Sequence, residues 1–150
     1  MLHFNNILLI VFFAMIASTI RAYFACQDKA QILRSPWRLC EVFGSFVWAD
    51  HIILGPFWAL ISLVCYLLQD MLLFMLIFSV FWLIRSCGEV LYWFLQQFHP
   101  RAGNEPEQYW IHRHAPGEAV WFLHQIFWQC ISVFAIILTI YFAYHWILTF

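Results

Sequence analysis

Charged residues are scarce in this chain: of 150 residues, only 10% are charged, whereas 65% are hydrophobic and 21% are aromatic. Soluble domains average about 45–50% apolar and about 25% charged residues. A water-soluble fold of this length has too little interior to bury so much apolar surface, so the composition excludes a soluble globular protein and indicates a lipid solvent. The formal net charge of -1 leaves no basic face for nucleic acid.

The chain also lacks two cysteines in a CxxC spacing, which excludes a zinc knuckle and the quinone-linked disulfide oxidases of similar size. The odd number of cysteines argues against a disulfide framework. Inside an apolar run, a free cysteine usually acts as a small hydrophobe. We expect this role for three of the five, which are Cys26, Cys40, Cys65, Cys87 and Cys130.

No Lys or Arg precedes the first apolar run, although a secretory signal peptide normally begins with a positively charged region. We therefore expect this first run to be a membrane span that the mature protein retains.

Four apolar runs predict four membrane-spanning helices in a single transmembrane domain, 1–150. The second and third runs are separated only by Gln69 and Asp70. As one helix they would be about 78 Å long at 1.5 Å per residue, far more than the roughly 30 Å hydrocarbon core. The chain must therefore break at these two polar residues. The predicted spans cover about 4–25, 47–68, 71–98 and 119–148.

Apart from two arginines, the basic residues are confined to the two long loops, 26–46 and 99–118. Arg21 lies at the end of the first span nearest the first loop, and Arg85 lies inside the third span, in the half nearest the second loop. With four spans, both loops lie on one side of the membrane, and the opposite side has no Lys or Arg. The positive-inside rule then predicts cytoplasmic loops and two termini outside. Ser35-Pro36 in the first loop and Asn104 with Glu107 in the second resemble helix starts, which predicts a short interfacial helix in each.

Polar residues inside spans are rare and are candidates for function. In this chain they gather toward the predicted inner face and follow helical spacing, so we predict three stripes that meet in a polar interior. The predicted cluster comprises Asp50, His51, Arg85, Glu89, His124 and Gln125. The stripe in the last span continues through Gln129 and Ser132, and that in the third through Tyr92, Gln96 and His99.

Two interpretations of this cluster remain open. Arg85 and Glu89 are four residues apart and would neutralise each other, and Gln and Ser side chains commonly join membrane helices. Small residues support packing in the same way, as in Gly55 with Ala59 and in the ladder of Ala14, Ser18 and Ala22. Alternatively, the cluster binds a ligand or cofactor, with haem between His51 and His124 as one candidate. No zinc or other metal site is predicted.

A short segment, Tyr109 to Arg113 with Trp121 and His124, resembles part of the histidine box of the fatty acid hydroxylase and sterol desaturase family. That family requires further histidines where this chain has Ala115, Pro116 and Phe127-Trp128, so a di-iron centre cannot be assembled.

Two functions follow from these observations. The first is a scaffolding or accessory subunit that lies in the bilayer and packs against other membrane proteins or against itself. The second is a small membrane enzyme or a cofactor-binding protein of haem or quinone type. The sequence leaves open whether the protein is an enzyme.

Overall fold

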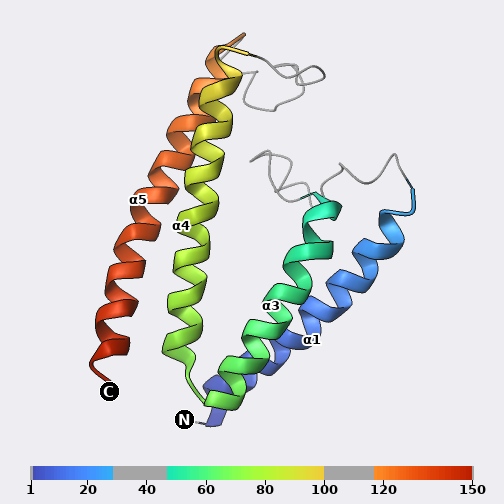
Figure 1. Cartoon of the computed structure of the whole chain (residues 1–150), viewed down its shortest axis with the longest axis vertical. Coiled ribbons are helices and arrows are strands. Elements are labelled where there is room, and N and C mark those ends of the chain that lie inside the picture. Colours follow the sequence, from blue (N-terminus) through green and yellow to red (C-terminus); the bar gives the residue numbers. More distant parts are fainter. Residues whose placement is uncertain (1, 29–46, 100–116, 150) are drawn as a thin grey trace. The chain divides into compact units, whose positions relative to one another are not determined.

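The computed structural model describes residues 2–28, 47–99 and 117–149, which are helical except for short turns at helix ends. The described part of the chain contains no β-strand (Figure 1). Its four helices are α1 (Leu2–Ala25), α3 (Trp48–Leu68), α4 (Met71–Gln96) and α5 (Ala119–Ile147).

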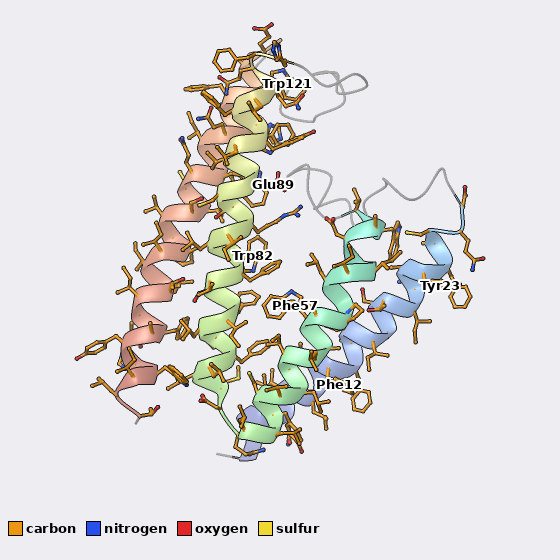
Figure 2. All side chains as sticks on the ribbon, viewed as in Figure 1. Phe12, Tyr23, Phe57, Trp82, Glu89 and Trp121 are labelled. Carbon is orange, nitrogen blue, oxygen red and sulfur yellow. The ribbon has the colours of Figure 1, made fainter. Side chains whose placement is uncertain are left out.

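Each of these helices is long and apolar enough to cross a membrane. The shortest, α3, has 21 residues. Its length of about 31 Å matches the roughly 30 Å hydrocarbon core of a bilayer. Large apolar side chains are exposed along all four helices, as expected of surfaces that face lipid (Figure 2). The structure confirms the predicted fold class, an all-α integral membrane protein with four transmembrane helices, and is consistent with a four-helix bundle.

The predicted interfacial helices lie outside the described residues, as does the segment from Tyr109 to Arg113. The described chain divides into two compact units, 1–74 and 75–150, and each is treated by itself below. In the first unit α1 packs along α3, and in the second α4 packs along α5 (Figure 1). The single domain proposed from the sequence stays a prediction.

The break between α3 and α4 lies at Gln69 and Asp70, as the sequence predicts. Gln69 adopts the left-handed helical conformation, with φ 56° and ψ 31°, which is a common way to end a helix. Asp70 then starts α4, because its Oδ1 accepts a hydrogen bond of 2.8 Å from the backbone N–H of Leu73. Each of the two polar residues therefore has a separate capping role.

A close approach between α1 and α3 occurs at Gly55, which is buried. A Cβ atom there would collide with Thr19 Oγ1 and would lie 3.2 Å from Thr19 Cβ and 3.3 Å from the Met15 carbonyl oxygen. The Thr19 hydroxyl donates a hydrogen bond of 2.8 Å to that same carbonyl, which holds it in place. Ala59 on the same face of α3 is also buried. Gly55 and Ala59 thus form the small-residue packing face that the sequence predicts.

The predicted packing ladder of small residues on α1 is only partly buried in the structure. Ala22 is buried and Ser18 is half-buried, but Ala14 is exposed. Each four-residue step rotates a side chain by about 40° around the helix, so a ladder of two steps drifts away from a straight neighbour. At Gly55, the close contacts come from Met15 and Thr19 and not from the residues of the ladder.

Candidate functional site

In the first unit, polar side chains in the C-terminal part of α1 contact side chains in the first turn of α3. Ser18 Oγ lies 3.0 Å from His51 Nδ1. The ring of Trp48 lies 5.9 Å from that of His51, and the Arg21 guanidinium stands 5.6 Å from the Trp48 ring, in the range of a cation–π contact. Asp50 lies in the first turn of α3, where the helix dipole favours a carboxylate. An aromatic ring with a cation beside it is typical of a membrane interface.

In the second unit, Arg85 and Glu89 form an ion pair on α4. Arg85 Nη2 lies 2.9 Å from Glu89 Oε1, and the two side chains are 29% and 11% exposed. Because the two opposite charges neutralise each other within one helix, the cost of keeping them in a membrane span is lower. For these two residues, the geometry supports the interpretation as a structural ion pair over that as a ligand site.

We expect the pair to be energetically coupled. Glu89→Ala leaves Arg85 without this carboxylate, so it should destabilise the protein more than the double change Arg85→Ala/Glu89→Ala does. Polar interactions between membrane helices average about 0.6 kcal/mol and reach about 1.7 kcal/mol in such cycles, so we expect a coupling of about 1 kcal/mol. Unfolding by detergent titration measures it, and additive effects of the two single changes would contradict the pairing.

His124 lies in an aromatic cluster between α4 and α5. It is 4% exposed, and its ring stacks on that of Trp93 with centroids 4.4 Å apart. Trp121 stacks on Trp93 as well, at 5.7 Å and an interplanar angle of 21°. His124 Nδ1 lies 2.8 Å from the Val120 carbonyl oxygen, and because a carbonyl only accepts, Nδ1 carries the proton in this contact. His124 therefore has a stacking partner and a backbone partner within its own helix pair.

Two further polar contacts join α5 to α4 or to the turn that follows it. In that turn, the Gln97 side-chain amide donates a hydrogen bond of 2.6 Å to Gln125 Oε1. The Ser132 hydroxyl oxygen lies 2.9 Å from Ser86 Oγ, and Ser86 in turn donates to the Leu83 carbonyl oxygen at 3.0 Å. Hydrogen bonds of this kind join membrane helices because lipid offers no competing partner.

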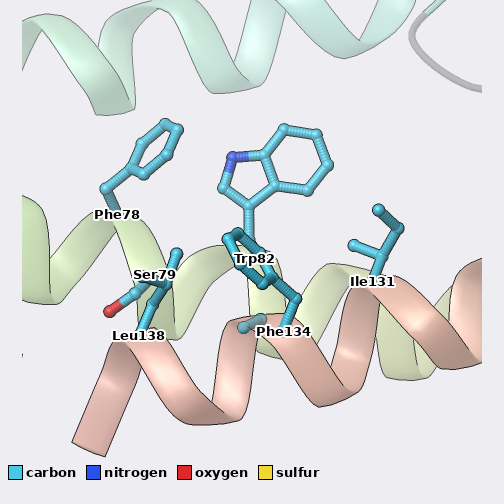
Figure 3. Close-up of a pocket in the computed structure, with 7 residues that line it drawn as sticks. Phe78, Ser79, Trp82, Ile131, Phe134 and Leu138 are labelled. Atoms are coloured by element: carbon cyan, nitrogen blue, oxygen red, sulfur yellow. The ribbon is translucent and has the colours of Figure 1, made fainter. Parts of the chain in front are cut away.

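An apolar pocket of about 280 Å³ opens between α4 and α5. Figure 3 shows the rings of Phe78, Trp82 and Phe134 around it. Two of its lining side chains carry a polar group: Ser79, whose hydroxyl donates to the Leu76 carbonyl oxygen at 2.8 Å, and Trp82 with its indole N–H. The pocket therefore offers mainly shape and apolar surface to a neighbour.

Ser86 and Trp93 on α4 and Gln97 in the turn after it make hydrogen-bonding or stacking contacts with α5. Each follows a residue of the predicted stripe, and one helical residue turns a side chain by about 100°. The stripe still reaches the packed side, because Gln96 is 4% exposed and Tyr92 packs against the cluster of Trp93 and Trp121. Ser86, Trp93 and Gln97 were not predicted from the sequence, although their own spacing of seven and four residues is a helical stripe.

The structure brings the predicted residues together in separate groups. Arg85 meets Glu89, and His124 lies in a cluster beside Gln125. Asp50 and His51 belong to the other unit. A cavity shared by all six residues stays a prediction. In the part of the chain that the structure describes, no three His, Cys, Asp or Glu side chains are placed to hold a metal ion.

These features define the class of protein: an integral membrane protein of apolar helices whose described polar groups bond mainly to neighbouring helices or to their own backbone. Comparison with protein-family models, with curated proteins and with solved structures gave no match.

Proposed function

We propose that this protein is a scaffolding or accessory subunit that packs in the bilayer against other membrane proteins or against further copies of itself. The observation that carries the proposal is the pairing of polar groups along α4 and α5. Arg85 contacts Glu89, Gln97 contacts Gln125, and Ser86 contacts Ser132. Groups taken up in such pairs serve helix packing and are poorly placed for acid–base or nucleophilic chemistry.

The exposed surface supports the same function. Isoleucine and aromatic side chains cover the outer faces of the helices, among them Ile53, Ile84 and Ile140, which are 74%, 70% and 65% exposed. Membrane helices associate through van der Waals packing of such faces, helped by occasional polar groups. The apolar pocket between α4 and α5 adds a concave surface to them.

Extraction from the native membrane in a mild detergent tests the proposal. We expect a particle that contains more than one 18.0 kDa chain, or this chain with another membrane protein in fixed ratio. A single chain in nanodiscs and in every mild detergent would contradict the proposal.

A second candidate function is a small membrane enzyme or a cofactor-binding protein of haem or quinone type. The histidines favour it, because both His51 and His124 contact a hydrogen-bonding neighbour through Nδ1. Metal-binding imidazoles use that nitrogen in the same way and coordinate through Nε2. A strong haem absorption band in the purified protein, lost in His51→Ala or His124→Ala, would establish this function over the first.

We further propose that both termini lie outside and that the loops 26–46 and 99–118 lie in the cytoplasm, because the Lys and Arg residues then gather on the inner side. In a cysteine-free background, Asp28→Cys and Gly103→Cys should react with a membrane-impermeant maleimide only after permeabilisation. Thr149→Cys should react in intact cells. Labelling of Asp28→Cys or Gly103→Cys from outside would overturn this orientation.

A further inference from the structure

Arg21 is an exposed cation near the end of α1, four residues and about 6 Å along the axis before Ala25. Its guanidinium carbon lies 5.6 Å from the centre of the ring of Trp48, the first residue of α3. The two residues therefore lie at the same end of their spans. Cations and tryptophans at the end of a span lie at the depth of the lipid headgroups.

The position of the Trp48 ring beside Arg21 is supported by contacts from both helices. The Trp48 and His51 rings lie 5.9 Å apart, and His51 Nδ1 in turn lies 3.0 Å from Ser18 Oγ on α1. All four residues belong to the first compact unit of the chain. Their arrangement therefore does not depend on where the second unit lies.

The guanidinium of Arg21 is available to a ligand. In the part of the chain that the structure describes, no carboxylate forms an ion pair with it. The five N–H donors of a guanidinium lie in its plane, so a ring against one face leaves these donors available along the edge. Their fork geometry fits two oxygens of a phosphate at once.

We propose that Arg21, with its guanidinium against the Trp48 ring, binds the phosphodiester of one phospholipid headgroup. Headgroup phosphates form a continuous layer at the depth of these two residues, so they are the most concentrated anion that Arg21 meets. Asp50 lies two residues after Trp48 and offsets the charge of Arg21 at longer range. Binding therefore depends on direct contact with the guanidinium more than on diffuse attraction. This site is independent of the proposed packing function.

Lipid titration followed by native mass spectrometry tests the site. The protein in mild detergent is titrated with phosphatidylethanolamine, and the fraction of 18.0 kDa chains that carry one lipid is measured. Arg21→Gln should lower the apparent affinity about tenfold, equivalent to about 1.4 kcal/mol. Arg21→Lys keeps the charge but loses the planar fork, so it should lose most of the affinity as well. The mass of the retained molecule distinguishes a phospholipid from a haem or a quinone.

Lys29→Gln is the matched control, because it removes the same charge at the start of the neighbouring loop. It should leave the affinity nearly unchanged. Equal losses from Arg21→Gln and Lys29→Gln, or full affinity in Arg21→Lys, would indicate diffuse attraction and overturn the site. Unchanged affinity in Arg21→Gln would overturn it as well, because the guanidinium then binds another group, such as a carboxylate of the chain.

Free inorganic phosphate separates the two sources of the ligand. At the concentration of the added lipid it should displace none, because it lacks the acyl chains that lie along α1 and α3. Displacement of the lipid by inorganic phosphate would show that the site takes a soluble phosphate, and it would overturn the proposal of a lipid site.

Discussion

Replacement of Trp93 by alanine is expected to lower the free energy of unfolding by about 3–5 kcal/mol, the range for large aromatic side chains in packed cores. Trp93 is fully buried, and both Trp121 and His124 stack on it. Its removal would leave both rings without their shared partner and open a cavity between α4 and α5. Lipid cannot enter a small interior cavity, so the lost van der Waals contacts are not replaced.

The neighbouring residue gives a matched control for this prediction. Phe94 is also aromatic and on α4, but it is 43% exposed. Phe94→Ala should change the free energy of unfolding by less than about 1 kcal/mol, because lipid replaces its outer contacts. Similar losses from Trp93→Ala and Phe94→Ala, measured by detergent titration, would show that the aromatic cluster does not hold the helices together.

Gly55→Leu is expected to destabilise the α1–α3 pair by about 1–3 kcal/mol or more, the usual cost of overfilling a packed interface. Even the first added carbon would collide with Thr19 Oγ1 and press on the Met15 carbonyl oxygen, which belongs to the backbone of α1. The helices must then separate, which also weakens the contact between Ser18 and His51. Detergent titration, together with the distance between probes on α1 and α3, measures the effect.

Gly88→Leu is the control, since a Cβ at Gly88 would meet nothing within 4 Å. It should be neutral or slightly stabilising, because glycine is a poor helix former. Gly55→Ala/Thr19→Ala should recover part of the stability lost in Gly55→Ala. If Gly55→Leu and Gly88→Leu behave alike, the close approach at Gly55 has no energetic role.

The membrane spans could be predicted from the sequence because lipid leaves a chain few alternatives. Every backbone group must be bonded within its own segment, so a long apolar run becomes a helix. The length of the combined run required a break, and the two polar residues Gln69 and Asp70 gave its position. Their separate capping roles did not, because a left-handed C-cap at a non-glycine residue has no distinctive sequence pattern.

The contact faces were harder to predict. In a soluble helix the apolar side marks the core, but in these spans apolar residues cover all sides, so polar spacing was the remaining signal. On α4 that signal followed Arg85 and Glu89, which pair with each other, while Ser86 bonds to α5 and Trp93 stacks on it. A serine and a tryptophan share no charge or amide with such a stripe, so their helical spacing did not identify them as a contact face.

The prediction for Gln129 shows the same limit. Its spacing from Gln125 placed both amides on one stripe, and under the packing interpretation both would bond to neighbouring helices. Gln125 bonds to Gln97, whereas Gln129 lies on the exposed side of its helix pair. Four residues turn a helix by about 40° beyond a full turn, enough to move a side chain from the edge of a contact to the outer surface.

Native mass spectrometry of the protein released from lipid nanodiscs tests the central claim most directly, namely that the polar residues of the spans serve packing and assembly. We predict a particle heavier than one 18.0 kDa chain, with no bound small-molecule cofactor in fixed ratio. A particle of one chain carrying one cofactor would contradict the claim, and it would establish the cofactor-binding function instead.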